Sequence, residues 1–331
     1  MSISLLICDD SSFAQKQLLH ALPEDWDVMI TYAKNGKDAL KVIAEQKMSV
    51  MFLDLNMPIL DGYGVLAKLQ EDNSKLRVIV VSGDIQDEAF NRVKDLGALD
   101  FIKKPVSKEE IIRVVQQYGL DEELIEEEAP LDQDHDIDLF DAYREVTNVA
   151  MGQAASLLAK VLDAFVVMPI PNVNMIEITE LQMAINSAIS RDYSSAVCQG
   201  FMGGGLAGEA MLLFSDSSYA DMAKMMHFEG EMDDTAEIEL LMDLTNILIG
   251  ACTNGLAEQF DIDISLGHPT VLGRHMVNYD VINKSNYRWK STLAIDLPIT
   301  IENKDINANL LLLFTEDSIP RFNQLISYVA A

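Results

Sequence analysis

Two stretches of the chain repeat the same order of side chains that could do chemistry. Each has an acid, a second acid four residues later, an asparagine three residues after that, and a proline beyond 22 further residues. Steps of four and three residues place the two acids and the amide on one face of a helix. A carboxylate there can pair with a cation on a partner, and a neutral amide can orient a water during phosphoryl transfer. The first copy is Asp141, Glu145, Asn148 and Pro171, and the second copy is Glu239, Asp243, Asn246 and Pro269.

A glycine follows each asparagine by four residues, at Gly152 and Gly250. On a helical wheel of about 100° per residue, the polar row of the first copy continues into Gly152, Ala155 and Ala159. Small residues beside a polar row leave room for another surface, so we expect a docking face there. The other side of this helix is predicted to be apolar, with Val146, Val149, Ala150, Ala154, Leu157 and Val161.

A second set of reactive side chains follows short apolar runs near the N-terminus. Asp9 and Asp10 follow the first run, Asp54 follows the third, Ser82 closes the fourth, and Lys104 with Pro105 follows the fifth. If these runs are parallel strands, their carboxyl ends share one edge of the sheet, so the side chains converge. Clustered carboxylates need a compensating cation or proton, and oxygen ligands of this kind suit Mg²⁺.

These runs alternate with helical periodicity from Ser2 to about Gln117, for example at Asp38–Gln46 and Gly64–Glu71. Five such alternations predict an α/β fold, a doubly wound five-stranded parallel sheet, over residues 1–120. The strand candidates are Leu5–Cys8, Val28–Tyr32, Val50–Leu53, Val78–Val81 and Phe101–Ile102.

The ordered set of Asp9 and Asp10, Asp54 with Met57-Pro58 and Asp61-Gly62, Ser82, and Lys104-Pro105 resembles response-regulator receiver domains of the CheY type. The resemblance implies that Asp54 accepts a phosphoryl group from a histidine kinase. It further implies an Mg²⁺ ion held by Asp10, Asp54 and the backbone carbonyl of Asn56, with Asp9 reaching it through water. Ser82 and Lys104 would contact the phosphoryl oxygens, and Phe101 matches the aromatic switch position.

An acidic segment separates this part of the chain from the rest. From Asp121 to Asp138 there are ten acids and no Lys or Arg, with Pro130 in the middle. Such a run is typical of a solvated linker, which we place at residues 121–136. The second domain, 137–331, then divides into halves of about 137–230 and 231–331.

The two halves repeat more than the opening motif. Met211–Asp216 recurs as Leu311–Glu316, and both read as a strand that passes into a helix. We therefore expect an α+β domain with a pseudo-twofold internal repeat and an antiparallel sheet. The string Gly203–Gly208 fits GxGxxG but precedes a strand, so it indicates a hairpin turn instead of a dinucleotide loop.

The first motif also resembles the signature of the CheC/CheX/FliY family, phosphatases that act on phosphorylated CheY. By that resemblance Glu145 pairs with the active-site lysine of the target receiver, Asn148 places the attacking water, and Asp141 supports the site. The second copy departs from the signature, because Glu239 replaces Asp or Ser and Asp243 replaces Glu. Asp is one methylene shorter, which shortens its reach by about 1 Å, while Asn246 can still orient a water.

Composition narrows the classes of partner. The chain has 331 residues, 24 basic and 53 acidic, and a formal charge of -29, which repels nucleic-acid backbones and anionic membranes. The three cysteines lack CxxC spacing, so neither a disulfide framework nor a zinc site is expected. Without a signal-like N-terminus or 18 consecutive apolar residues, the sequence predicts a cytoplasmic protein that does not span a membrane.

Together these patterns predict a two-component chemotaxis response regulator whose receiver controls a CheC-like phosphatase. Its expected substrate is the phosphoaspartate of a phosphorylated CheY-type receiver, its phosphodonor is a histidine kinase, and a CheD-like protein is a further candidate partner. Two alternatives stay open: a non-catalytic binding module related to flagellar switch proteins, or a phosphatase that acts on its own Asp54.

Overall fold

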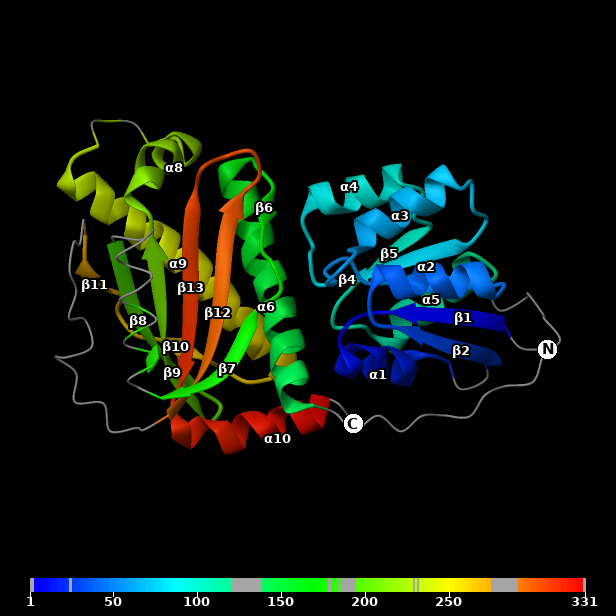
Figure 1. The fold of residues 1–331 in the computed structure, drawn as a ribbon. Helices are drawn as coiled ribbons and strands as arrows, with labels where there is room; N and C mark the ends of the chain where they lie inside the picture. The colour runs from blue at the N-terminus through cyan, green and yellow to red at the C-terminus, as the bar shows by residue number, and fades with distance from the viewer. Residues whose placement is uncertain are drawn as a thin grey trace. The chain divides into compact units, whose positions relative to one another are not determined.

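The chain forms two compact units, Met1–Glu145 and Val146–Val329. The first unit extends beyond the predicted receiver boundary at residue 120, and within it Asp141 contacts Phe13 and Glu145 contacts Lys104. The predicted linker, 121–136, lies outside the described residues. The computed structural model describes residues 3–23, 26–120, 138–177, 180–181, 183, 185, 195–228, 230, 232–274 and 291–329 (Figure 1).

The first unit contains a five-stranded sheet in which every neighbouring pair is parallel, as the sequence predicts. The strand order is β2-β1-β3-β4-β5. All five predicted strands are present, most of them one or two residues longer than expected. They are β1 (Ile3–Cys8), β2 (Val28–Ala33), β3 (Val50–Leu53), β4 (Arg77–Ser82) and β5 (Asp100–Lys103).

Helices cover both faces of this sheet, because alternate strand residues point to opposite sides. Ile3, Leu5 and Ile7 of β1 pack in one core cluster with residues of α1 and α5. Leu6 and Cys8 pack in the other with residues of α2, α3 and α4. The helices are α1 (Ser12–Ala21), α2 (Gly36–Glu45), α3 (Gly62–Glu71), α4 (Asp87–Asp95) and α5 (Lys108–Gln117).

Four of these helices begin at a side chain that accepts a backbone N–H bond from the first turn. These capping side chains are Ser11, Asn35, Asp61 and Ser107. The cap at Asp61 starts α3 directly after the loop that follows Asp54.

The second unit is built on an antiparallel sheet of eight strands among the described residues, in the order β10-β8-β9-β13-β12-β6. In addition, β11 pairs with β8 and β7 pairs with β12. The strands are β6 (Val166–Val167), β7 (Asn172–Glu177), β8 (Ser195–Gly203), β9 (Leu206–Phe214), β10 (Ser265–Leu266), β11 (Thr270–Gly273), β12 (Ser291–Ile301) and β13 (Asn307–Phe314).

Strands from one sequence half pair with strands from the other half. β6 and β7 of the first half pair with β12 of the second, whereas β10 and β11 of the second pair with β8 of the first. The repeated segments meet in the middle of the sheet as the antiparallel pair β9 and β13. The α+β prediction is therefore confirmed, and neither half could keep its strand pairing without the other.

Each repeated strand passes into a helix through a 3₁₀ turn, as predicted. The first passage is Asp216–Ser218 followed by α8 (Tyr219–Met225), and the second is Glu316–Ser318 followed by α10 (Ile319–Val329). Gly203–Gly208 includes the turn between β8 and β9, so the expected hairpin is confirmed.

Two long helices carry the repeated motifs, α6 (Leu139–Leu162) and α9 (Asp234–Phe260). Length and composition alone would let α9 cross a membrane, but 61% of its most apolar window is buried, as in core helices of folded domains.

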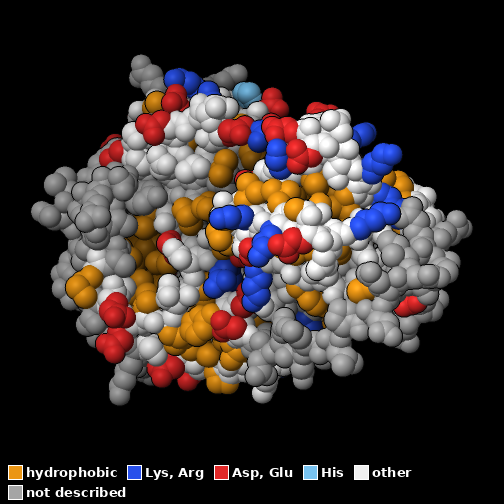
Figure 2. All heavy atoms as spheres, turned by 45° about the vertical axis from the view of Figure 1, so that its right-hand side comes forward, with side chains coloured by type: hydrophobic (Ala, Val, Ile, Leu, Met, Phe, Trp, Pro, Cys, Tyr) orange, Lys and Arg blue, Asp and Glu red, His pale blue; other side chains and the backbone are white. Residues whose placement is uncertain are grey.

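On the face drawn in Figure 2, basic side chains are interspersed with acidic ones.

The helical wheel predicts the buried side chains correctly in the first half of α6 and incorrectly in the second half. Val146, Val149, Ala150 and Ala154 are buried as predicted, but Leu157 is 49% exposed and Val161 is 39% exposed. The buried row instead advances in steps of four, through Leu158 and Leu162. A real helix has 3.6 residues per turn, so this row drifts around the axis away from the predicted stripe.

Candidate functional site

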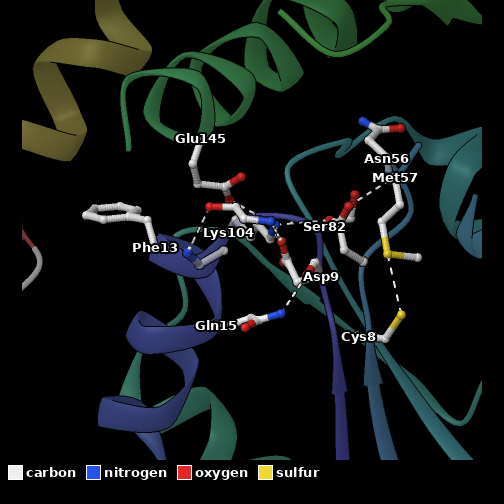
Figure 3. A network of polar contacts seen from close by, with 12 residues as sticks. Cys8, Asp9, Phe13, Gln15, Asn56, Met57, Ser82, Lys104 and Glu145 are labelled. Atoms are coloured by element: carbon white, nitrogen blue, oxygen red, sulfur yellow. Dashed lines mark hydrogen bonds and ion pairs between the residues drawn. The ribbon is translucent and has the colours of Figure 1, made fainter. Parts of the chain in front are cut away.

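The reactive side chains of the first unit meet at one edge of its sheet. Asp9 follows β1, Asp54 follows β3, Ser82 ends β4 and Lys104 follows β5. Because the strands are parallel, these ends lie together (Figure 3). Each of the four residues is less than a tenth exposed. The structure thus brings together the side chains that the sequence pattern predicted.

The Lys104 ammonium lies at the centre of the site. It donates a hydrogen bond to Asp9 Oδ2 at 2.7 Å. Its Nζ also forms ion pairs with Asp54 Oδ1 at 3.1 Å and with Glu145 Oε1 at 2.8 Å. Neither of these two oxygens accepts a hydrogen bond of good geometry among the described residues. One cation therefore serves three carboxylates.

Backbone groups hold the two aspartates in place. Asp9 Oδ1 accepts the Ser11 N–H at 2.9 Å, and Asp54 Oδ2 accepts the Asn56 N–H at 2.8 Å. The Gln15 amide donates from α1 to the carbonyl oxygens of Asp9 at 2.7 Å and Ala33 at 3.3 Å. Sequence reasoning missed Gln15, although a polar residue between apolar helix positions was a usable signal.

The Asp61-Gly62 pair has a structural reason. A Cβ atom at Gly62 would lie 2.3 Å from the Asp54 carbonyl oxygen and 2.9 Å from Leu55 Cα. The Gly62 N–H donates to the Leu55 carbonyl at 3.0 Å. A glycine is needed there so that the start of α3 can pack directly against the backbone at Asp54.

Ser82 and Phe101 occupy positions that fit their predicted roles without testing them. Ser82 is fully buried, and its Oγ accepts the Asp84 N–H at 3.1 Å. Asp84 in turn accepts from the Gln86 amide, two contacts that the sequence did not predict. The Phe101 ring packs edge-on against Phe90, with centroids 6.1 Å apart.

Burial and the excess of carboxylates control the charges of this site. Burial lowers the pKa of Lys104, but Asp54, Asp9 and Glu145 raise it, and the net shift is well upward. Burial raises the pKa of Asp9 and of Glu145, although Lys104 opposes the shift in both. Burial and then the charge of Asp54 raise the pKa of Asp10 to about 7. The site therefore favours the uptake of a further cation or proton.

The donor set at this edge fits Mg²⁺ in kind. No three His, Cys, Asp or Glu side chains of the described residues form a group that could hold a metal by themselves. Mg²⁺, however, commonly uses only one or two carboxylates and keeps several waters. Asp10, Asp54 and the Asn56 carbonyl supply such oxygens, and the raised pKa of Asp10 shows how a nearby cation would be favoured.

The acids of the first motif belong to the same network. Asp141 Oδ2 accepts the backbone N–H of Phe13 at 3.1 Å, and Glu145 points to Lys104 (Figure 3). Both acids are buried, with 7% and 5% exposure, and Asn148, one helical turn further along α6, is 8% exposed. The backbone of Phe13 is a contact that no sequence pattern could have indicated.

The second motif has a different environment. Glu239, Asp243 and Asn246 are all exposed on α9. A Cβ atom at Gly250 would meet no other atom within 4 Å. The structure therefore places the three predicted residues together on one open helix face.

Comparison with known proteins agrees with the fold and site of the first unit. Residues 5–116 match the family model of the response regulator receiver domain. A protein-glutamate methylesterase/protein-glutamine glutaminase of Halalkalibacterium halodurans is 39% identical over 106 residues, which are 31% of this chain and 30% of that relative. The chain thus spans about a third of the curated relative that it matches. Its N-terminal part is a receiver domain of the CheY type.

Two solved structures each align with part of the chain. Thermotoga maritima FliY aligns over 57% of this chain and 96% of its own, with 18% identity and a TM-score of 0.45. The response regulator domain of Thermotoga maritima CheB aligns over 35% of this chain and 96% of its own, with 28% identity and a TM-score of 0.32.

Proposed function

We propose that this chain is a chemotaxis response regulator that hydrolyses the phosphoaspartate of a CheY-type receiver. The observation that carries the proposal is the ion pair of 2.8 Å between Glu145 and Lys104. It joins the second acid of the repeated motif to the lysine that would contact a phosphoryl group. A carboxylate at this lysine is what a phosphatase of this kind needs for docking.

Asp54 is the proposed site of phosphorylation, with a histidine kinase as phosphodonor. Its carboxylate is 2% exposed, is held by the Asn56 N–H, and lies 3.1 Å from the Lys104 ammonium. Bound Mg²⁺, held by Asp10, Asp54 and the Asn56 carbonyl, would supply positive charge for the phosphoryl oxygens. Ser82 and Lys104 would donate to those oxygens, and Phe101 would report the change to the α4 side of the domain.

In the proposed hydrolysis, Glu145 holds the lysine of the target receiver and the Asn148 carboxamide orients a water. The water oxygen attacks phosphorus, and the bond between phosphorus and the aspartate oxygen breaks. The aspartate leaves as a carboxylate, and the phosphate carries away the protons of the water. The amide takes no proton, because in phosphoryl transfer positioning and charge stabilisation account for most of the catalysis. Asp141 is a positioning residue through its bond to the Phe13 N–H.

The second motif is proposed as a weaker site of the same kind. Asn246 keeps the water-orienting amide, while Asp243 carries the shorter acid and Glu239 replaces the supporting residue. All three are exposed on α9 and so are open to a separate receiver. A CheD-like protein is a further proposed partner, and the esterase activity named for the methylesterase relatives remains a property of those proteins.

The test follows the decay of a separate, phosphorylated CheY-type receiver in the presence of Mg²⁺. The full chain carries Asp54→Asn, so that it cannot hold the phosphoryl group itself. We expect Asn148→Ala to slow the decay, and Asn148→Ala with Asn246→Ala to slow it further, by at least about tenfold in all. Asn254→Ala removes another exposed asparagine of α9 and should leave the rate unchanged. Equal decay with every variant and with no added chain would overturn the proposal.

A further inference from the structure

The two acids of the first motif, Asp141 and Glu145, contact receiver residues within the unit Met1–Glu145. Lys104 and Glu145, which form the ion pair described above, have side chains that are only 4% and 6% exposed. The Phe13 N–H, one residue into α1, donates to Asp141. Both acids of the motif therefore have their partners in the receiver of the same chain.

These contacts are buried, unlike ion pairs on an exposed surface. Carboxylates are seldom buried without a compensating partner, because their desolvation is costly. Glu145 and Asp141 are both below a tenth exposed, and each faces a donor of the receiver. The ammonium that Glu145 reaches also lies 3.1 Å from Asp54 Oδ1. A single side chain thus links the motif to the carboxylate that would be phosphorylated.

The Lys104 ammonium could exchange one of its three carboxylate contacts for a contact with a phosphoryl group. An ammonium has three donors, and here its nitrogen lies 2.7 Å from Asp9 Oδ2, 3.1 Å from Asp54 Oδ1 and 2.8 Å from Glu145 Oε1. A phosphoryl oxygen on Asp54 could take the donor that now approaches Asp54 Oδ1, while the contact with Glu145 is kept. The resting contact is therefore compatible with a phosphorylated Asp54.

We infer that the substrate of the first motif is the phosphoaspartate at Asp54 of the same chain, which makes the protein a self-resetting response regulator. The inference rests on the proposed function and names its substrate. A water oriented by Asn148 attacks phosphorus, the bond to the Asp54 oxygen breaks, and Asp54 returns to a carboxylate as inorganic phosphate leaves. Covalent linkage makes this encounter intramolecular, at an effective concentration of order millimolar, which a separate receiver must compete against.

The first experiment measures the decay of the phosphorylated full chain after labelling with acetyl phosphate and Mg²⁺. The rate constant is expected to stay the same across a hundredfold dilution. Asn148→Ala should slow it by at least about tenfold, and Glu145→Gln should slow it as well. Asn254→Ala on α9 and Glu45→Gln on α2 remove an exposed asparagine and an exposed glutamate as matched controls, and should not change it.

The second experiment separates action within a chain from action between chains. Phosphorylated Asn148→Ala chain is mixed with an excess of unphosphorylated Asp54→Asn chain, whose first motif is intact. At low micromolar concentration the receiver of the added chain itself occupies the first motif, so the added chain should leave the slow decay nearly unchanged. The test of the proposed function uses the separate receiver at a concentration that approaches this effective concentration of order millimolar. Full restoration of the wild-type rate, or a rate that falls with dilution of the wild type, would overturn the inference.

The outcomes also distinguish this inference from the proposed function. If the chain accelerates decay of a separate receiver but its own decay depends on concentration, only the inference fails. If Asn148→Ala alters neither decay, the proposed phosphatase activity itself is wrong. If every variant loses its own phosphoryl group at the wild-type rate, the inference is overturned and Glu145 is only a structural partner of Lys104.

Discussion

The two motifs, on α6 and on α9, share their spacing but not their surroundings. On α6, Glu145 is 5% exposed and pairs with Lys104, and Asp141 accepts a backbone N–H. On α9, Glu239, Asp243 and Asn246 are exposed. The same spacing of residue types on two helices therefore does not guarantee the same environment.

The difference has a chemical consequence. A buried carboxylate beside an ammonium interacts in a medium of low dielectric, whereas an exposed one is screened by water and salt. The same acid-acid-amide order can thus be a fixed contact in one place and an open surface in the other. Four changes would break or sharpen this contrast, and they are described from the largest expected effect to the smallest.

Lys104→Met should have the largest effect, because it leaves the carboxylates of Asp9, Asp54 and Glu145 without their shared cation. Loss of one partner from a buried ionic network typically costs roughly 3–5 kcal/mol. We expect a loss of that size in the free energy of unfolding, measured by urea denaturation without Mg²⁺. Lys75→Met, in the exposed loop before β4, is the matched control. A loss below about 1 kcal/mol would mean that the site tolerates unpaired carboxylates.

Asp10→Asn should change how stability depends on pH. The folded-state pKa of Asp10 is raised to about 7 from an ordinary value of 3.8, so the folded state binds the proton more tightly than the unfolded state. Stability from this group is complete below pH 3.8 and is lost as the pH rises through about 7. With screening taken into account, the free energy of unfolding falls by on the order of 2 kcal/mol over this pH range.

The measurement is thermal or urea unfolding of the magnesium-free chain at several pH values. Asp10→Asn should flatten the decline between pH 4 and 7. Mg²⁺ should do the same in the wild type if it binds where proposed. An unchanged pH profile in the variant would show that other acids, such as Asp9 and Glu145, dominate the titration.

Gly250→Ala tests the open face of α9. A Cβ atom there meets nothing within 4 Å, and alanine favours the interior of a helix over glycine by roughly 0.5–1 kcal/mol. We expect the free energy of unfolding to rise by that amount. If a receiver docks closely on this face, the same variant should lower the rate at which the second motif acts on a separate receiver. Destabilisation would instead mean that the face is covered.

Asp243→Glu restores the longer acid to the second motif and should have the smallest effect. With Asn148→Ala blocking the first motif, we expect decay of a separate phosphorylated receiver to become about two- to threefold faster, as for a screened surface pair worth less than 1 kcal/mol. Asp87→Glu, an exposed change on α4, is the control. No gain would show that the length of the acid is not what limits the second motif.

Much of the first unit could be predicted because local patterns suffice there. Strands such as Val50–Leu53 are continuous apolar runs, and parallel order then brings Asp9, Asp54 and Lys104 to one edge. The helical wheel of α6 was less successful, since Leu157 is exposed where burial was expected. A wheel gives the angle of a side chain, whereas burial depends on which neighbours cover that angle.

The residue types and spacings by themselves determined the receiver fold, the convergence of its acids with Lys104, and the repeat in the second unit. Periodicity and strand-end chemistry are local, so they can be read from one chain. Only the tertiary structure decided that the halves exchange strands and that Glu145 lies 2.8 Å from Lys104. That lysine and that glutamate lie 41 positions apart in the sequence, and contacts over such a span depend on packing, which no local pattern encodes.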